Sequence, residues 1–192
     1  MFSASLEIVL TVAYREAVSR RHAYLTLEHL LYALAHDPDG ERILQAVGAD
    51  LGRLRADLNA YLSEHVEELA KGHEREPQQT AAFQRVLQTA VLHVQSAQRN
   101  EVQAGDILAA ILQQARSHAA KLLEAQHITR LDVLEYITHG IAKAGAPEEA
   151  QETLGTPEPA GGEPSRPARD PLSAYCSNLT TRAREGRLDP LV

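Results

Sequence analysis

The first 143 residues contain an internal repeat, and this repeat constrains the fold more than any other feature. Shifting the sequence by 77 positions superimposes apolar residues on apolar residues from Leu6 to Leu34 without a gap. The offset then grows to 80, which pairs Leu51 with Leu131 and Leu54 with Leu134. The preserved spacing favours duplication over chance matching of two Leu- and Ala-rich stretches. The pairs at offset 77 are Leu6 with Phe83, Val9 with Val86, Leu10 with Leu87, Ala13 with Ala90, Leu25 with Val102, Leu30 with Ile107, Leu31 with Leu108, Ala33 with Ala110 and Leu34 with Ile111.

The repeated segments have the periodicity of amphipathic helices. Leu6, Val9, Leu10, Ala13 and Ala17 follow the i, i+3, i+4, i+7 spacing of a helix with one buried face. Aromatic residues make up only 4% of the chain, so the core must consist of Leu, Ala, Val and Ile, which is typical of packed helices. The sequence therefore predicts an all-α domain without strands. We expect about eight helices, arranged as two four-helix halves related by a pseudo-twofold axis.

The helix boundaries follow from capping and turn residues. Thr26 is the expected N-cap of the second helix, with Leu25 and Leu30 as its hydrophobic staple. The run Asp37-Pro38-Asp39-Gly40 is expected to end that helix. A segment rich in Glu, His and Pro, residues 67–79, is expected to join the two halves. The remaining helices are expected over 41–47, 50–62, 81–97, 105–114, 117–125 and 129–141.

The composition changes after residue 143. Six of the nine prolines lie between Pro147 and Pro171, and Leu154 is the only large apolar residue in 144–170. Such a segment cannot bury enough apolar surface to offset its ordering entropy, so 144–170 is expected to be a disordered linker. Residues 171–192 regain apolar side chains but are too few to form a domain. We therefore expect one domain over 1–143, with halves of about 1–66 and 80–143, then a linker and the start of a further module.

Charge and cysteine content exclude several classes of protein. The net charge is −7 and no five like charges are consecutive, which argues against a nucleic-acid or anionic-membrane partner. Cys176 is the single cysteine, so an intrachain disulfide cannot form and a reducing compartment is expected. No apolar run approaches 18 residues, and the first ten residues contain no basic side chain. Neither a membrane-spanning helix nor a secretory signal is expected.

The sequence contains no recognisable catalytic, cofactor or metal motif. Each of the three lysines follows an alanine, so the Gly-Lys-Ser/Thr of a phosphate-binding loop is absent. His22, His29 and His36 are spaced by seven residues. The Thr26 cap is expected to separate His22 from the others, and two histidines seven apart on one helix lie about 10 Å apart along its axis, too far to share an ion. We therefore expect these residues to form no enzyme active site and to hold no cofactor.

Charged residues gather at the junction of the halves. Two interpretations of this cluster remain open, a solvated loop and a polar docking surface where the halves meet. The residues are Glu64, Glu67, Glu68, Glu74 and Glu76, with Lys71, Arg75 and Arg85 among them.

Several motifs resemble one protein family. The segment Thr26-Leu27-Glu28-His29-Leu30-Leu31-Tyr32-Ala33-Leu34 resembles the signature of the duplicated N-terminal domain of Clp/Hsp100 unfoldases. The final segment, from Asn178-Leu179-Thr180 to Leu188-Asp189-Pro190-Leu191, is similar to the lead-in of the family's first AAA+ ATPase module. Further stretches, in order along 1–143, resemble the ClpA branch in particular. They are Phe83-Gln84-Arg85-Val86-Leu87-Gln88, His93-Val94-Gln95-Ser96, Arg99-Asn100-Glu101-Val102, Arg130-Leu131-Asp132-Val133 and Ile137-Thr138-His139-Gly140.

The resemblance implies a docking function. It implies a mobile N-domain on a hexameric ring that unfolds proteins in the bacterial cytoplasm and feeds the ClpP peptidase. The domain would bind protein substrates and the adaptor ClpS, ATP would belong to the longer parent, and the fragment itself would be monomeric. Glu28 and Thr80 match adaptor-contact residues of the family, and Arg85 lies beside them in the charged junction. Ser63 followed by Glu64 stands where relatives have a contact glutamate, and Ala23 stands where a glutamate occurs in relatives.

Two alternatives to this function remain. The chain could be part of an enzyme subunit that itself binds nucleotide, against which the missing lysine motif argues. It could instead be the N-domain of a ClpB- or ClpC-type disaggregase or unfoldase. The stretches 93–96 and 99–102 favour the ClpA branch.

Overall fold

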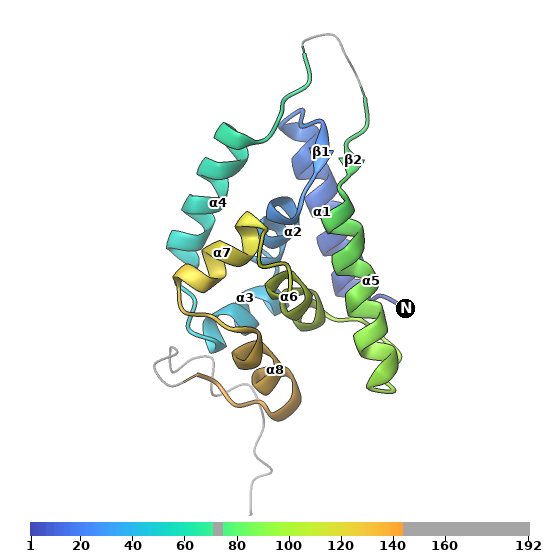
Figure 1. Cartoon of the computed structure of the whole chain (residues 1–192), viewed down its shortest axis with the longest axis vertical. Helices are drawn as coiled ribbons and strands as arrows, with labels where there is room; N and C mark the ends of the chain where they lie inside the picture. The colour runs from blue at the N-terminus through green and yellow to red at the C-terminus, as the bar shows by residue number, and fades with distance from the viewer. Residues whose placement is uncertain (71–74, 144–192) are drawn as a thin grey trace, which may run out of the picture. The chain divides into compact units, whose positions relative to one another are not determined.

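The computed structural model describes residues 1–70 and 75–143, and the statements below concern these residues. The expected linker and the expected start of a further module lie outside them. The elements are α1 (Ala4–Ser19), β1 (Tyr24–Leu25), α2 (Leu27–Leu34), α3 (Pro38–Ala46), α4 (Leu51–His65), β2 (Gln78–Gln79), α5 (Ala81–Ser96), α6 (Ala104–Leu112), α7 (His118–Ala125) and α8 (Arg130–His139) (Figure 1). The prediction of an essentially all-α domain with eight helices is confirmed for this part of the chain.

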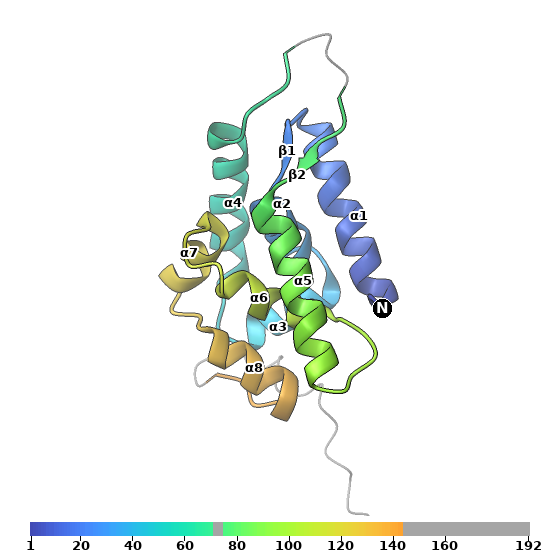
Figure 2. The ribbon, with the colours of Figure 1, turned by 45° about the vertical axis from the view of Figure 1, so that its right-hand side comes forward.

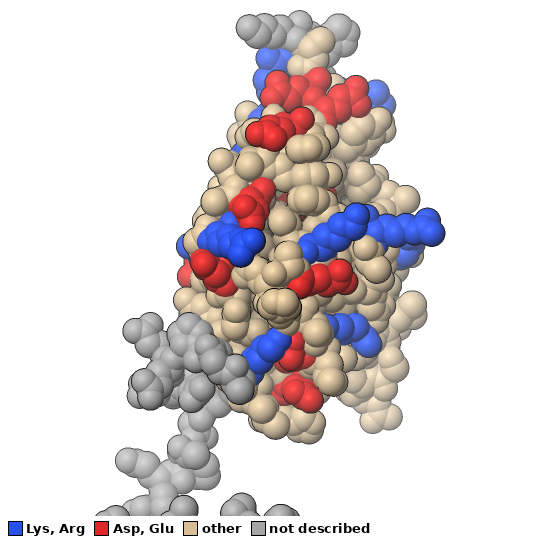
Figure 3. Space-filling view, turned by 60° about the vertical axis from the view of Figure 1, so that its left-hand side comes forward, with Lys and Arg blue, Asp and Glu red and all other residues tan. Residues whose placement is uncertain are grey.

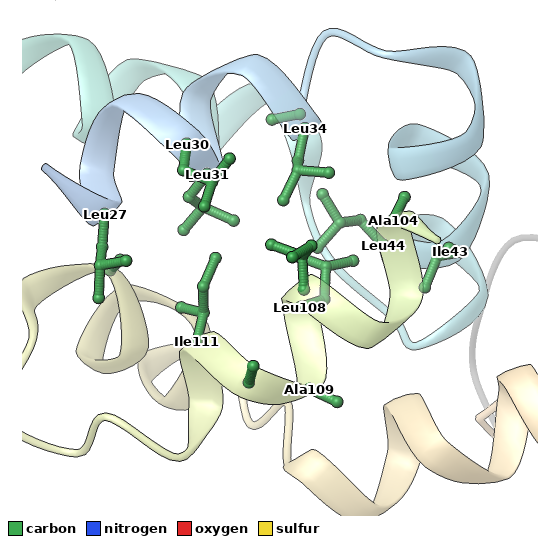
Figure 4. Packing of buried hydrophobic residues seen from close by; sticks show 14 of the residues in the cluster. Leu27, Leu30, Leu31, Leu34, Ile43, Leu44, Ala104, Leu108, Ala109 and Ile111 are labelled. Carbon is green, nitrogen blue, oxygen red and sulfur yellow. The ribbon is translucent and has the colours of Figure 1, made fainter. Parts of the chain in front are cut away.

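Helices α2 and α6 form the centre of the core, and the other helices surround them (Figures 1 and 2). Leucines along α2 face Leu108 and Ile111 of α6 (Figure 4). In the repeat, Leu30 corresponds to Ile107, the residue just before Leu108. Leu30 and Leu108 both have 0% exposure. Of the side chains paired at offset 77, only Leu10 and Leu87 are partly rather than fully buried. The repeat therefore identifies the core correctly.

Two reciprocal backbone contacts relate the halves. Strand β1 pairs in parallel with β2, so that Leu25 lies opposite Gln79. Phe2 forms the equivalent parallel bridge with Val102, which is the same contact with the two halves exchanged. In each case the first residues of one half pair with the residues just before the second helix of the other half. A pseudo-twofold axis requires this exchange. The expectation of a domain without strands is corrected, because strands of two residues are too short to show an alternating pattern.

The repeat offset beyond residue 37 also needs correction. Helix α3 has 9 residues and α7 has 8, so the offset falls from 80 to 79 across these helices. Leu54, with 0% exposure, therefore corresponds to Val133 at 1%. Leu131, which the offset of 80 pairs with Leu51, is 62% exposed. A one-residue difference inside a short helix leaves no sequence signal besides this change of register.

The run from Asp37 to Gly40 begins a helix and does not end one. Helix α2 ends at Leu34, and the Asp37 carboxylate accepts hydrogen bonds from the amides of Asp39 and Gly40, each at 3.1 Å. A capping Asp followed by Pro at the first helical position is a helix-start signal. Gly40 is required here, because a Cβ at this position would lie 2.0 Å from the Leu34 carbonyl oxygen.

Candidate functional site

Four of the five predicted site residues lie at two helix ends, and the fifth, Glu28, lies on α2. Ser63 and Glu64 are exposed in the last turn of α4, and Arg85 is exposed in the second turn of α5. Thr80 is the half-buried N-cap of α5. The chain from Val66 to Gln79 connects these two helix ends. The site is therefore formed where the two halves of the domain are joined.

Ser63 is held by Arg20, the residue that directly follows α1. Its hydroxyl accepts a hydrogen bond from Arg20 Nη1 at 3.1 Å, and Arg20 Nη2 donates to Asn59 Oδ1 at 2.6 Å. Arg20 Nε also donates to Glu16 at 2.7 Å. The Arg20 side chain thus joins α1 to α4. Glu64, by contrast, makes no salt bridge with any residue in 1–70 or 75–143.

Thr80 has two structural roles. Its hydroxyl oxygen accepts a hydrogen bond from the Phe83 amide at 3.3 Å, which caps α5. The same hydroxyl donates to the Leu25 carbonyl at 3.2 Å, beside the strand pair that connects the halves. A substitution of Thr80 would disturb the fold as well as any partner contact.

Glu28 is not a surface residue. Only 6% of it is exposed, and its carboxylate accepts a hydrogen bond from the amide of Ala119 at 3.0 Å. Ala119 is in the first turn of α7, where unpaired amides and the helix dipole favour a negative charge. The sequence places Glu28 in the first turn of its own helix, and the structure shows that its carboxylate also caps a helix of the other half.

The chain around the start of α7 contacts both groups of predicted residues. On one side, the ring of Tyr61 on α4 stacks on His118, with ring centroids 3.9 Å apart and an interplanar angle of 11°. On the other side, Arg85 Nη1 of α5 donates to Gln114 Oε1 at 3.3 Å, just before α7. The end of α4 and the start of α5 therefore both contact the chain that leads into α7.

An aromatic stack is part of this region and was not predicted from the sequence. Tyr61 also stacks on His65, with centroids 4.9 Å apart and an interplanar angle of 3°. Tyr61 thus stacks on two imidazoles, one from each half of the domain. The i, i+4 spacing of Tyr61 and His65 is the one sequence signal for it, because His118 is distant in the sequence.

The Tyr61 hydroxyl remains protonated at neutral pH. Burial raises the pKa of Tyr61 above its usual value of 10.0, and the negative charge of Glu28 raises it further. No hydrogen bond joins the Tyr61 hydroxyl to a described residue, and the hydroxyl is not among buried unsatisfied atoms, since Tyr61 is half-buried. It is therefore a hydrogen-bond donor that an external group can reach.

Acidic residues gather at one end of the domain. Figure 3 shows them at the upper end of the face that it presents. Three glutamates are exposed here. Glu64 lies in the last turn of α4, and Glu67 and Glu68 lie just beyond its end. The Glu67 carbonyl accepts a hydrogen bond from the Ala23 amide at 2.9 Å, which fixes this segment beside β1. These side chains place negative charge at the end of α4, which suits a basic partner surface.

Two polar pairs occupy equivalent positions in the halves, and three of their four residues (His22, His29 and Asp106) are buried, whereas Arg99 is exposed. The first is His22 with His29, whose Nδ1 and Nε2 atoms are 2.8 Å apart. The second is an ion pair between Arg99 and Asp106, at positions 77 residues later. His93 Nδ1 lies 3.6 Å from the same Asp106 carboxylate, so the stretches 93–96 and 99–102 each supply a side chain to it.

The histidine pair is neutral. The Thr26 amide donates to His29 Nδ1 at 3.2 Å, so the proton of His29 is assigned to Nε2, which donates to His22. Burial first, and then His22 and Arg20, lower the pKa of His29 from 6.5 to about 3. The expectation that the Thr26 cap separates these histidines is corrected, because Arg21 takes a positive φ of 58° and returns the chain onto α2.

Neither a metal cluster nor a membrane span is found in the part of the chain that the structure describes. No group of three or more His, Cys, Asp or Glu side chains there could hold a metal ion. None of the described helices combines the length and apolarity needed to cross a bilayer.

Comparison with known proteins identifies relatives of the whole chain. A ClpA homolog protein from Fuscovulum blasticum is 39% identical over 197 aligned positions, which cover 100% of this chain and 25% of that protein. The chaperone protein ClpB of Propionibacterium freudenreichii is 27% identical over 184 positions, covering 95% of this chain and 19% of that protein. This chain therefore spans a quarter or less of the length of these relatives.

Solved structures share the fold. The N-domain of ClpV from Vibrio cholerae has a TM-score of 0.61 and 23% identity, covering 71% of this chain and 82% of that chain. A complex of a ClpV N-domain with a VipB peptide has a TM-score of 0.58 and 21% identity, covering 72% of this chain and 85% of that chain. The model of the Clp repeat (R) N-terminal domain matches residues 1–126. This chain belongs to the Clp repeat N-terminal domain family.

Proposed function

We propose that this chain is the adaptor- and substrate-docking N-domain of a ClpA-like AAA+ unfoldase of the bacterial cytoplasm. In this proposal it binds a ClpS-type adaptor and helps to deliver proteins for unfolding and for degradation by ClpP. Nucleotide binding belongs to the longer parent, because these residues lack a phosphate-binding loop. The 39% identity to a ClpA homolog over the whole chain supports this assignment.

The position of Glu64 is the observation that carries the proposal. Its carboxylate is exposed at the end of α4 and makes no salt bridge with the described residues. It can pair with a basic side chain of an adaptor without breaking a contact within the domain. Ser63 and Thr80, in contrast, already hold α1 and β1 in place. Arg85 adds an exposed cation on the other side of α7.

A related fold binds a peptide. The ClpV N-domain has been solved in complex with a VipB peptide. This supports protein recognition as a use of the Clp N-domain fold. For the present chain, the adaptor is the proposed partner because a ClpA homolog is 39% identical to it over the whole chain.

Calorimetric titration of a ClpS adaptor from the same source tests the proposal. We expect the wild-type chain to bind and the Glu64→Lys variant to bind more weakly, because charge reversal slows association and places like charges opposite each other. Glu135→Lys is the matched control, since Glu135 is also exposed but lies on α8. The thermal melts of both variants should stay close to that of the wild type, as an exposed charge contributes under about 1 kcal/mol.

Failure of the wild-type chain to bind would contradict the adaptor function. Equal affinities of the wild type and Glu64→Lys would remove Glu64 from the site. The 27% identity to ClpB supports a ClpB-type N-domain as the alternative. It predicts that the chain binds aggregated protein in the absence of any adaptor, which a co-sedimentation experiment measures. ATP hydrolysis by this chain would contradict both.

A further inference from the structure

We propose that the docking surface includes the stack of Tyr61, His65 and His118, and that Glu28 positions this stack from beneath without touching the adaptor. The inference rests on the proposed function and identifies further residues of the same site. Tyr61 would supply a hydroxyl donor to an oxygen acceptor of the adaptor, either a carbonyl or a carboxylate.

The stack is continuous with the residues already placed at the site. Tyr61 and His65 belong to the same last turns of α4 as Ser63 and Glu64. His118 opens α7, and the preceding Gln114 accepts the hydrogen bond from Arg85. An adaptor that contacts Glu64 on one side and Arg85 on the other would therefore cover the start of α7.

The stack is suited to binding because its rings are already ordered. The Tyr61 ring stacks on two imidazoles, at centroid distances of 4.9 Å and 3.9 Å. A side chain that is fixed before association loses little conformational entropy on binding. Tyrosine is also enriched among the residues that dominate interface energies, since its ring is apolar and its hydroxyl donates.

Glu28 determines where His118 lies. Its carboxylate accepts the Ala119 amide at 3.0 Å, and so attaches α2 to the residue next to His118. Because Glu28 is 6% exposed, little of it remains for an adaptor to contact. Its effect on docking would then pass through α7 and the His118 ring, which makes it a positioning residue.

Titration of the adaptor into Tyr61 variants tests the stack. Tyr61→Phe keeps the ring and removes only the hydroxyl, and we expect it to weaken binding about 2- to 10-fold, as for one net hydrogen bond. Tyr61→Ala also removes the stack and should weaken binding ~10-fold or more. Tyr14→Phe is the matched control, because Tyr14 is 36% exposed on α1 and should bind as the wild type does.

Two Glu28 variants separate positioning from contact. Glu28→Gln keeps an oxygen acceptor for the Ala119 amide and should retain the wild-type affinity, whereas Glu28→Ala should bind several-fold more weakly. In NMR spectra, the imidazole resonances of His65 and His118 should shift on saturation with adaptor. The resonances of His139, exposed on α8, should not. The NMR readout and Tyr61→Phe remain informative if Tyr61→Ala fails to fold.

The outcomes are distinguishable from failure of the proposed function. If the wild type does not bind the adaptor, the proposed function and this inference both fall. Suppose that Glu64→Lys weakens binding but Tyr61→Phe and Tyr61→Ala keep the wild-type affinity. If the imidazole resonances of His65 and His118 then also do not shift, the stack lies outside the docking surface. Equal weakening by Glu28→Gln and Glu28→Ala would show that the carboxylate itself contacts the adaptor and would overturn the positioning role.

Discussion

The buried histidine pair predicts a defined loss of stability in mild acid. The pKa of His29 is about 3 in the folded chain, whereas an unperturbed histidine, as in the unfolded chain, has a pKa of 6.5. Since the folded state holds this imidazole neutral, its contribution to stability is complete above pH 6.5 and is lost as the pH falls below that value. From these two values, the loss between pH 7.5 and pH 5 is about 2 kcal/mol.

The variant His29→Gln isolates this contribution. A Gln side chain at the third helical position can still accept the Thr26 amide, as the side chains of capping boxes do, but it does not titrate. Urea unfolding followed by circular dichroism at pH 7.5, 6 and 5 gives the free energy of unfolding of each protein. We expect the decrease between pH 7.5 and pH 5 to be about 2 kcal/mol smaller in the variant. Parallel decreases in the two proteins would refute a neutral, buried His29.

Three further predictions concern the fold. Leu30→Ala and Leu108→Ala should each lower the free energy of unfolding by about 2–5 kcal/mol, because both side chains are fully buried, and an unchanged melting temperature would contradict the repeat alignment. Leu131→Ala, at a position 62% exposed, should change it by about 0.5 kcal/mol or less, and a core-sized loss would restore the offset of 80. Gly40→Ala should destabilise the domain more than an exposed Gly→Ala change does, since its Cβ would collide with the Leu34 carbonyl, and a thermal melt equal to wild type would disprove that close approach.

The sequence predicts the repeat and the core well because burial of apolar side chains is periodic along a helix. Leu30 and Leu108 illustrate this, since their spacing alone places them in the core. The reciprocal strand pairs could not be predicted in the same way. Strands β1 and β2 have two residues each and the Phe2–Val102 contact is a single bridge, and their partners are set by the packing of the two halves and not by local periodicity.

The site is less accessible to sequence reasoning than the core. Glu28 accepts a hydrogen bond from Ala119, which is 91 residues away, and nothing local to Glu28 indicates this partner. Likewise, Tyr61 and His118 meet only because α4 and α7 pack together. A family motif gives the identity of such residues, whereas their atomic partners require the three-dimensional structure.

Chemical-shift mapping of the labelled chain with unlabelled ClpS tests the central claim most directly. The account predicts that the backbone amides that shift lie at the end of α4, around the start of α7 and at the start of α5. Amides of α3 and α8 should remain unchanged at saturation. The absence of any shift, or shifts confined to α3 and α8, would contradict the claim that the junction of the halves is an adaptor-docking surface.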